Sequence, residues 1–147
     1  MRVQKHAEFE VIERPQSDGG LDLVVPFTTP ALTQAALDAA NQMGTGLNAS
    51  IRLVKVQVVP FPMDLNQSPV ALDFVREQMR HFRSELETQP EIRLAREHTP
   101  GLVGTLRPNS VVVIAYRKRP WRTREERLAG ALWKAGYHAV LTGESNA

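Results

Sequence analysis

The 147-residue sequence contains no cysteine. This absence excludes a disulfide framework, a thiolate zinc site, thioredoxin-type redox chemistry and a cysteine nucleophile. Aromatic residues make up only 6% of the chain, and no run of about 18 apolar residues occurs, so the sequence predicts no membrane span. The first residues, which include Arg2, Lys5 and His6, lack the apolar segment of a signal peptide. We therefore expect a cytoplasmic protein.

Neither sign of charge dominates the composition. Lysine and arginine number 18 against 16 acidic residues, and the formal net charge of +2 is too small for bulk electrostatic binding of nucleic acid. No pair among the four histidines has metal-ligand spacing, and there is neither a Gly-x-Ser-x-Gly elbow nor a Gly-Lys-Ser/Thr loop. A metal site, acyl transfer and P-loop chemistry therefore have no support in the sequence, and we expect no enzyme activity.

Hydroxyl residues mark four expected helix starts. Three of them precede a proline, at Thr29-Pro30, Ser68-Pro69 and Thr99-Pro100. A hydroxyl at the N-cap accepts an unpaired backbone N–H, and proline in the next position gives up a donor that has no partner there. The fourth start is Thr123, which precedes Glu126 at the spacing of a capping box.

The spacing of apolar residues predicts how far these helices run. The clearest amphipathic pattern follows Ser68-Pro69, with apolar residues at steps of three and four. Its members are Leu72, Val75, Met79, Phe82 and Leu86. Gly44 is placed to end the first helix, and Gly136 is placed to end the last one.

Five short apolar runs alternate with these helices. They span residues 21–27, 51–59, 92–95, 111–116 and 137–141. The fourth run is continuously apolar, which is typical of a strand buried on both faces. The alternation predicts a three-layer α/β/α fold with a parallel sheet. Residues 1–20 do not follow the pattern, so we expect an N-terminal arm or an extra edge strand before one domain over residues 21–147.

The order of these elements resembles the universal stress protein family from Leu21 to Thr142. The resemblance rests on a first strand that ends in a threonine-rich turn, an alanine-rich first helix, a second strand closing on Val-Val-Pro-Phe-Pro, and a late apolar strand followed by a loop, a helix and a short final strand. It implies the fold shared with adenine nucleotide alpha hydrolase-like proteins, five parallel strands in the order 3-2-1-4-5. It also implies a homodimer, ATP binding as in many members, a role in the stress response and, because some members are fused to membrane transporters, a transporter or other protein as partner.

The nucleotide motif of that family is missing at the matching positions. Nucleotide-binding members carry an acidic residue at the end of the first strand, where this sequence has Phe27. They carry Gly-x-x-Gly after the fourth strand, near Ala115 and Lys118 here, and a Gly-Ser or Gly-Thr that falls near Leu128. Without glycine the backbone cannot curl its N–H groups around a phosphate, and Pro120 removes one donor. We therefore expect a degenerate site with no cofactor bound in the standard way.

Basic and aromatic side chains gather where a ligand would bind, since ligands of open α/β sheets lie beyond the carboxyl ends of the strands. The candidate ligand or phosphate residues are Thr28, Arg117, Lys118, Arg119 and Arg122, and the candidate stacking or lining residues are Phe27, Tyr116 and Trp121.

Three functions remain open from these residues. The first is a regulatory or assembly domain that has lost its nucleotide. The second is an anion or ATP gripped by arginine side chains, whose forks suit phosphate oxygens. The third is nucleic-acid contact through the same loop. The basic run is equally open to interpretation as an ordinary solvated loop.

The last expected strand offers an edge for dimerisation. In a 3-2-1-4-5 order it lies at the margin of the sheet with unpaired backbone N–H and C=O groups. The expected edge residues are Tyr137, His138, Ala139, Val140 and Leu141. We expect a twofold homodimer through this edge, with the arm of residues 1–20 as the alternative cover.

Overall fold

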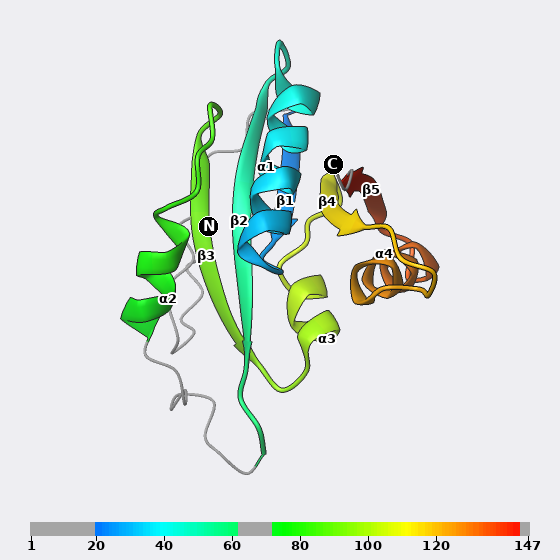
Figure 1. Ribbon diagram of the computed structural model, residues 1–147. Coiled ribbons are helices and arrows are strands. Elements are labelled where there is room, and N and C mark those ends of the chain that lie inside the picture. The colour runs from blue at the N-terminus through cyan, green and yellow to red at the C-terminus, as the bar shows by residue number, and fades with distance from the viewer. Residues whose placement is uncertain (1–19, 62–71, 145–147) are drawn as a thin grey trace.

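The computed structural model describes residues 20–61 and 72–144, in which strands and helices alternate from β1 to β5 (Figure 1). The strands are β1 (Leu21–Pro26), β2 (Ala49–Val58), β3 (Thr88–Ala95), β4 (Ser110–Arg117) and β5 (His138–Glu144). The helices are α1 (Pro30–Gly44), α2 (Leu72–Met79), α3 (His98–Val103) and α4 (Arg124–Lys134). The expected N-terminal arm, up to residue 19, and the expected helix start at Ser68 lie outside the described residues.

All five strands are parallel and follow the order β3-β2-β1-β4-β5, which confirms the predicted fold class. β1 lies at the centre and is buried along its length apart from Leu21. β3 begins at Thr88, well before the apolar run at Ile92, because this edge strand continues through polar residues that the run did not include. Phe27 and Tyr137, expected within strands, lie just beyond β1 and just before β5.

Two apolar clusters hold helices against both faces of the sheet. α1 and α2 cover one face, where Leu37 and Val75 pack with Leu23. α3 and α4 cover the other face, where Leu102 and Leu132 pack with sheet residues such as Val24. Each such side chain contributes about 1.5–3 kcal/mol when fully buried. Figure 1 shows α2 and α4 at opposite ends of the molecule.

Two of the four expected N-caps are confirmed. Thr29 accepts a hydrogen bond from the backbone N–H of Leu32 at 3.2 Å, and Thr123 forms the expected capping box with Glu126. The start at Thr99 is wrong, because α3 begins two residues earlier than expected, at His98, and Glu97 occupies the N-cap without a side-chain bond. Pro100 is still tolerated there, since the first turn of a helix needs no donor at that position.

The prediction that the second helix continues to Leu86 is wrong, because α2 ends at Met79. Two side chains of α1 bind the backbone of the segment that follows. Gln34 bonds both the N–H and the C=O of Arg83, and the amide oxygen of Asn41 accepts from the N–H of Leu86 at 2.7 Å. These bonds give the backbone an alternative to helical pairing, while Leu86 still packs against the core.

One of the two expected helix-ending glycines is confirmed. Gly136 follows α4 with φ 92°, a left-handed conformation that favours glycine. Gly44 is instead the last residue of α1, and the left-handed residue is Gly46 with φ 80°. Position 44 needs a glycine because a larger residue would not fit. A Cβ there would lie 2.6 Å from a methyl carbon of Leu86.

A buried ionic network joins the strands near their amino ends. The Asp22 carboxylate of β1 accepts two hydrogen bonds from the Arg52 guanidinium of β2, at 3.0 and 2.8 Å, and a third from the Ser110 hydroxyl of β4 at 2.6 Å. Arg52 also contacts Glu91 of β3 at 3.1 Å. Burial alone would raise the pKa of Asp22, but these hydrogen bonds and the nearby arginine charges hold it below its ordinary value.

The helices of this structure are short. α1, the longest, has 15 residues, and no helix in the described part of the chain is long and apolar enough to cross a membrane.

Candidate functional site

The carboxyl ends of the parallel strands lie at one edge of the sheet, beside the first turns of α1, α3 and α4 (Figure 1). The segments that reach this edge are the turn at Phe27 and Thr28, the end of β2, and the loop from Arg117 to Arg122. We call this region the carboxyl edge. Most of the predicted site residues come from it, because a parallel sheet places all its strand ends together.

Phe27 lies in the core at this edge and not on an open surface. Its ring is 9% exposed and meets the ring of Phe82 edge to face, with centroids 5.7 Å apart. The Nζ atom of Lys55 lies 4.8 Å from the centroid of Phe27, as a cation over the aromatic face. The end of β1 is therefore filled by a packed aromatic pair with an ammonium group above it.

The two threonines after β1 have separate tasks. Thr29 caps α1, whereas the backbone N–H of Thr28 donates to the hydroxyl of Thr33 at 2.9 Å. Thr28 is partly buried. The backbone N–H of Thr28 is therefore already bonded within the fold, because Thr33 in α1 accepts from it.

Three positively charged or titratable groups interact across the carboxyl edge. His98 at the start of α3 has a pKa below its ordinary value, first because of burial and then because of the charges of Lys55 and Arg124. Burial also lowers the pKa of Lys55. Lys55 of β2 and Arg124 of α4 thus both act on His98 of α3, and a negative ligand beside His98 would offset their charges.

Lys55 and Arg124 were not among the predicted site residues. Lys55 interrupts the apolar run of β2, so a charge in a buried strand was the signal that could have found it. Arg124 is the first residue of α4, and His98 is the first residue of α3. Their proximity to Lys55 follows from tertiary structure, which no local pattern in the sequence reveals.

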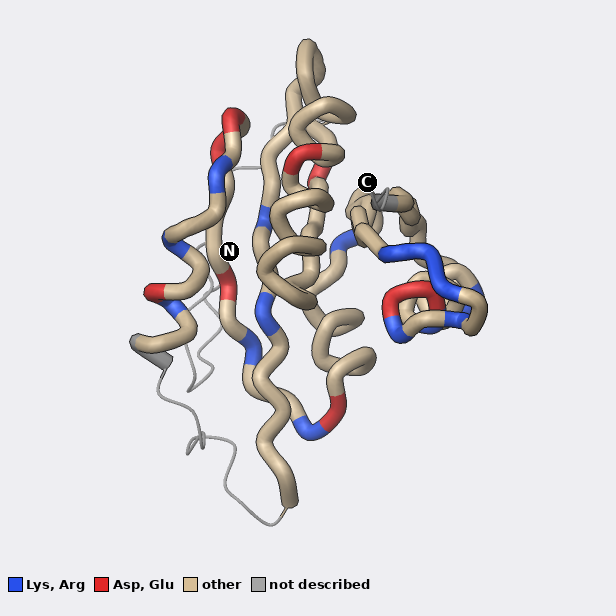
Figure 2. Tube along the Cα trace, viewed as in Figure 1, with Lys and Arg blue, Asp and Glu red and all other residues tan. Residues whose placement is uncertain are grey.

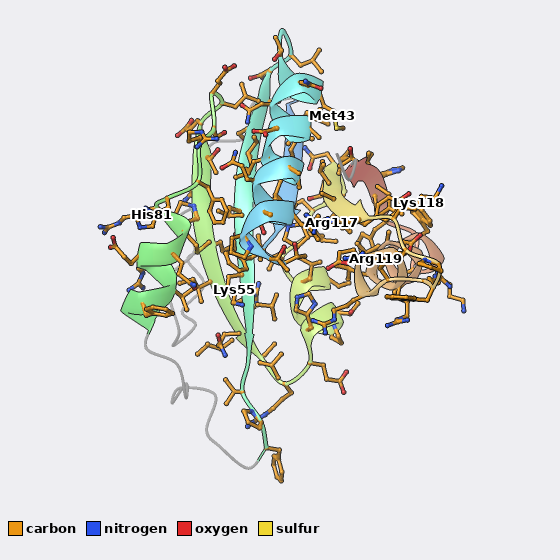
Figure 3. All side chains as sticks on the ribbon, viewed as in Figure 1. Met43, Lys55, His81, Arg117, Lys118 and Arg119 are labelled. Carbon is orange, nitrogen blue, oxygen red and sulfur yellow. The ribbon has the colours of Figure 1, made fainter. Side chains whose placement is uncertain are left out.

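The predicted basic loop is divided between two surfaces. Figure 3 shows Arg117 and Arg119 on the side of the loop that faces α3, and Lys118 on its outer side. Arg122 lies over α4, where a Cβ on Gly130 would be 2.5 Å from its Nη2 atom. The structure therefore does not bring all four basic residues around one point.

The other two predicted aromatic residues differ in their surroundings. Tyr116 lies beside β5, where a Cβ on Gly143 would be 3.6 Å from its ring and its hydroxyl oxygen. Trp121 is 65% exposed. Of the three predicted stacking or lining residues, only Trp121 presents most of its side chain to solvent.

The backbone of the loop after β4 has no left-handed residue. In the described ranges, positive φ occurs only at Gly46 and Gly136, both far from this loop in sequence. A concave nest of N–H groups alternates right-handed and left-handed residues, so this loop does not form one. The same ranges contain no cluster of three or more histidine, aspartate or glutamate residues that could hold a metal ion.

Within residues 20–61 and 72–144, β5 is an edge strand, as expected, and pairs only with β4. Val140 is exposed at its middle. The indole N–H of Trp133 in α4 donates to the backbone oxygen of Ala139 at 2.8 Å, so one main-chain acceptor of β5 already has a donor within the chain.

Comparison with known proteins returned no family for this sequence. No protein-family model matches the chain, and no curated protein matches it.

Proposed function

We propose that this chain is a non-enzymatic regulatory or assembly domain, similar to the universal stress proteins, that does not bind ATP through a backbone cradle. It acts by associating with a second copy through β5 or with a partner protein. The observation that carries the proposal is the packed Phe27 and Phe82 pair at the end of β1, the place where nucleotide-binding members of that family hold an acidic residue.

The loop after β4 supports the same proposal. A phosphate cradle needs backbone N–H groups that converge, and convergence needs residues with positive φ. The loop has none, and Pro120 contributes no donor. Main-chain recognition of a triphosphate is therefore not available at this loop.

Thermal unfolding with nucleotides tests the proposal. The full chain is heated alone and with ATP, ADP, AMP and cyclic AMP at rising concentrations. A ligand at about 100 times its Kd would stabilise the fold by roughly 2.7 kcal/mol, so binding would be visible as a higher Tm. We expect no change in Tm with any nucleotide. A rise with ATP that survives Arg119→Gln and Lys55→Met would show recognition by the backbone and contradict the proposal.

A second candidate function is an anion site at the carboxyl edge that uses side chains only. The charges of Lys55 and Arg124, which both act on His98, favour it, because a bound anion would interact favourably with these charges and with the imidazolium. The 11-residue helix α4 also directs its N-terminal dipole to this edge.

The pKa of His98 distinguishes this candidate from the first. In an NMR titration, pyrophosphate bound beside the imidazole would raise that pKa, and Arg119→Gln would weaken the effect. Lys118→Gln is the matched control, because it removes the same charge from the outer side of the loop (Figure 3). No response of His98 to pyrophosphate or ATP would exclude the side-chain site.

A further inference from the structure

The outer surface of α4 and its preceding loop carries a group of cations. We call it the α4 basic face, and its members are Lys118, Trp121, Arg122, Arg127 and Lys134. Trp121 and the four cations are exposed. Figure 2 shows the basic segment of the loop and α4 together at the margin of the molecule, beside the acidic first turn of α4 formed by Glu125 and Glu126.

Electrostatic interactions and a hydrogen bond bring Lys118, Arg122 and Arg127 onto one surface. The charges of both Arg122 and Lys118 act on Glu126, although its capping bonds with Thr123 are the main cause of its lowered pKa. Arg127 donates to the backbone oxygen of Arg122 at 3.0 Å. No ion pair within the described part of the chain joins any of the four cations to an acid.

Gly130 leaves room for a cation on the surface of α4. Because position 130 has no side chain, the Arg122 guanidinium lies across α4 at a point where a Cβ would be 2.5 Å away. Lys134 follows four residues later on the same helix, so it lies on the same side as Gly130. The guanidinium thus adds a cation to the helix surface between Arg127 and Lys134.

Trp121 gives the basic face an apolar member. Its side chain is 65% exposed, and it precedes Arg122 in the sequence. An indole prefers the headgroup region of a bilayer, where its apolar ring and its N–H are both accommodated.

We propose that the α4 basic face docks this domain onto a bilayer surface that carries anionic lipid headgroups, with α4 parallel to the membrane plane. The charges are complementary, and each lysine or arginine near such a surface contributes attraction. This proposal does not depend on the nucleotide or assembly proposal, since it uses a different surface.

Nucleic acid fits this face less well. Proteins that bind single strands combine a basic groove with a series of aromatic platforms, whereas this face is the outside of a helix with one indole. Sequence-specific recognition of a duplex needs side chains that form hydrogen bonds with base edges. Gly130 and Ala131, which stand between the cations, have no side-chain group that could form such a bond. A planar partner needs neither a groove nor base-reading groups.

Vesicle co-sedimentation of the full chain tests the proposal. Vesicles of phosphatidylcholine with phosphatidylglycerol are compared with vesicles of phosphatidylcholine alone. We expect binding only to the anionic vesicles, and weaker binding as salt rises. Lys118→Gln with Arg127→Gln should lower the partition coefficient on the order of thirtyfold, from the attraction of two cations. Arg80→Gln with Arg83→Gln, an equal charge change near α2 at the other end of the molecule, should leave it unchanged.

Tryptophan emission gives a second readout. Anionic vesicles should shift the emission to shorter wavelength, and Trp121→Phe should reduce the shift. The proposal is overturned by equal binding to both vesicle types, by no binding to anionic vesicles at low salt, or by an equal loss in the Arg80 and Arg83 variant. Binding of a single-stranded oligonucleotide that depends on Lys118 and Arg127, without vesicle binding, would assign the face to nucleic acid instead.

Discussion

Asp22 shows at the scale of single residues how a charge is kept inside this fold. Its side chain is 4% exposed, and Arg52 and Ser110 together supply three hydrogen bonds to it. The ionised carboxylate is therefore the form that the folded protein stabilises. Stability from this group is fully present above the ordinary pKa near 3.8 and is lost as pH falls from there through the lower pKa of the folded state.

Removing one partner of this buried pair should be costly. Arg52→Met leaves the Asp22 carboxylate buried without its guanidinium, and we expect a loss of about 3–5 kcal/mol in the free energy of unfolding. Urea denaturation at neutral pH measures it. Arg107→Met is the matched control, because Arg107 lies 3.7 Å from the same carboxylate but is more exposed, so it should cost less than about 1 kcal/mol. Equal losses in both variants would contradict this account.

His98 should titrate below its ordinary pKa of 6.5, because burial and the charges of Lys55 and Arg124 disfavour the imidazolium. The unfolded chain then takes up this proton first as pH falls. The contribution of His98 to the free energy of unfolding is therefore complete above pH 6.5. It declines as pH falls from there through the lower pKa of His98 in the folded state. Stability measured against pH should lose this slope in His98→Gln, and a His98 pKa above 6.5 by NMR would refute the prediction.

The residues of the carboxyl edge were only partly predictable from sequence. Thr29 and Thr123 were found because capping is local and depends on neighbours in the chain. The grouping of Lys55, His98 and Arg124 was not found, because it joins three elements that meet only when the sheet is assembled. Whether Arg117, Lys118, Arg119 or Arg122 contacts a ligand stays a prediction.

The helices on one face of the sheet depend on two glycines in opposite ways. A Cβ on Gly101 of α3 would lie 2.7 Å from the Cβ of Ala95 and 2.9 Å from a methyl carbon of Val56, so α3 lies close against β2 and β3. A Cβ on Gly130 of α4 would meet only the end of the flexible Arg122 side chain.

The same substitution should therefore have opposite signs in these helices. Gly101→Ala should destabilise the protein by about 1–3 kcal/mol through overpacking against the sheet. Gly130→Ala should stabilise it by up to about 1 kcal/mol, because alanine is the better helix former and the arginine can move aside. Calorimetry of the two variants provides the comparison, and a lower Tm for Gly130→Ala would show that the Arg122 position is rigid.

The end of α2 illustrates why element boundaries were predicted less well than elements. The apolar pattern continued to Leu86 because Phe82 and Leu86 are core residues, but periodicity does not reveal that Gln34 and Asn41 bind the intervening backbone. The strands were easier to identify. The central strands β1 and β4 have mostly apolar sequences because both faces are covered, which is a property of each segment by itself.

At the scale of the whole molecule, the sheet formed by the described residues has its edges at β3 and β5. β3 contains Pro90, which has no N–H to offer, whereas β5 contains no proline and exposes Val140. For this reason β5 is the edge through which we propose that two copies associate. The alternation of strands and helices predicted a parallel sheet. The order of the strands was implied by the resemblance to the universal stress protein family and agrees with the structure, while the dimer remains a prediction.

Light scattering of the full chain after gel filtration tests this association. Val140→Lys should convert a dimer to a monomer, because it places a charge in the middle of the paired edge. Val58→Lys is the matched control, since Val58 is 37% exposed against 36% for Val140 but lies at the end of β2. A monomeric parent protein, or a dimer that survives Val140→Lys, would exclude this interface.

The ionic network around Asp22 favours one register of the strands in the sheet. Side chains alternate between the two faces of a strand, so a one-residue slip of β2 would turn Arg52 into the apolar layer beneath α1. The carboxylate would then be orphaned in the interior. Strands that are apolar on both faces bury a similar apolar area in neighbouring registers, so buried area alone distinguishes these registers poorly. In this sheet a shifted register of β2 costs the free energy of one unpaired buried carboxylate. The hydrogen bond from Ser110 to Asp22 makes the register of β4 depend on the same carboxylate.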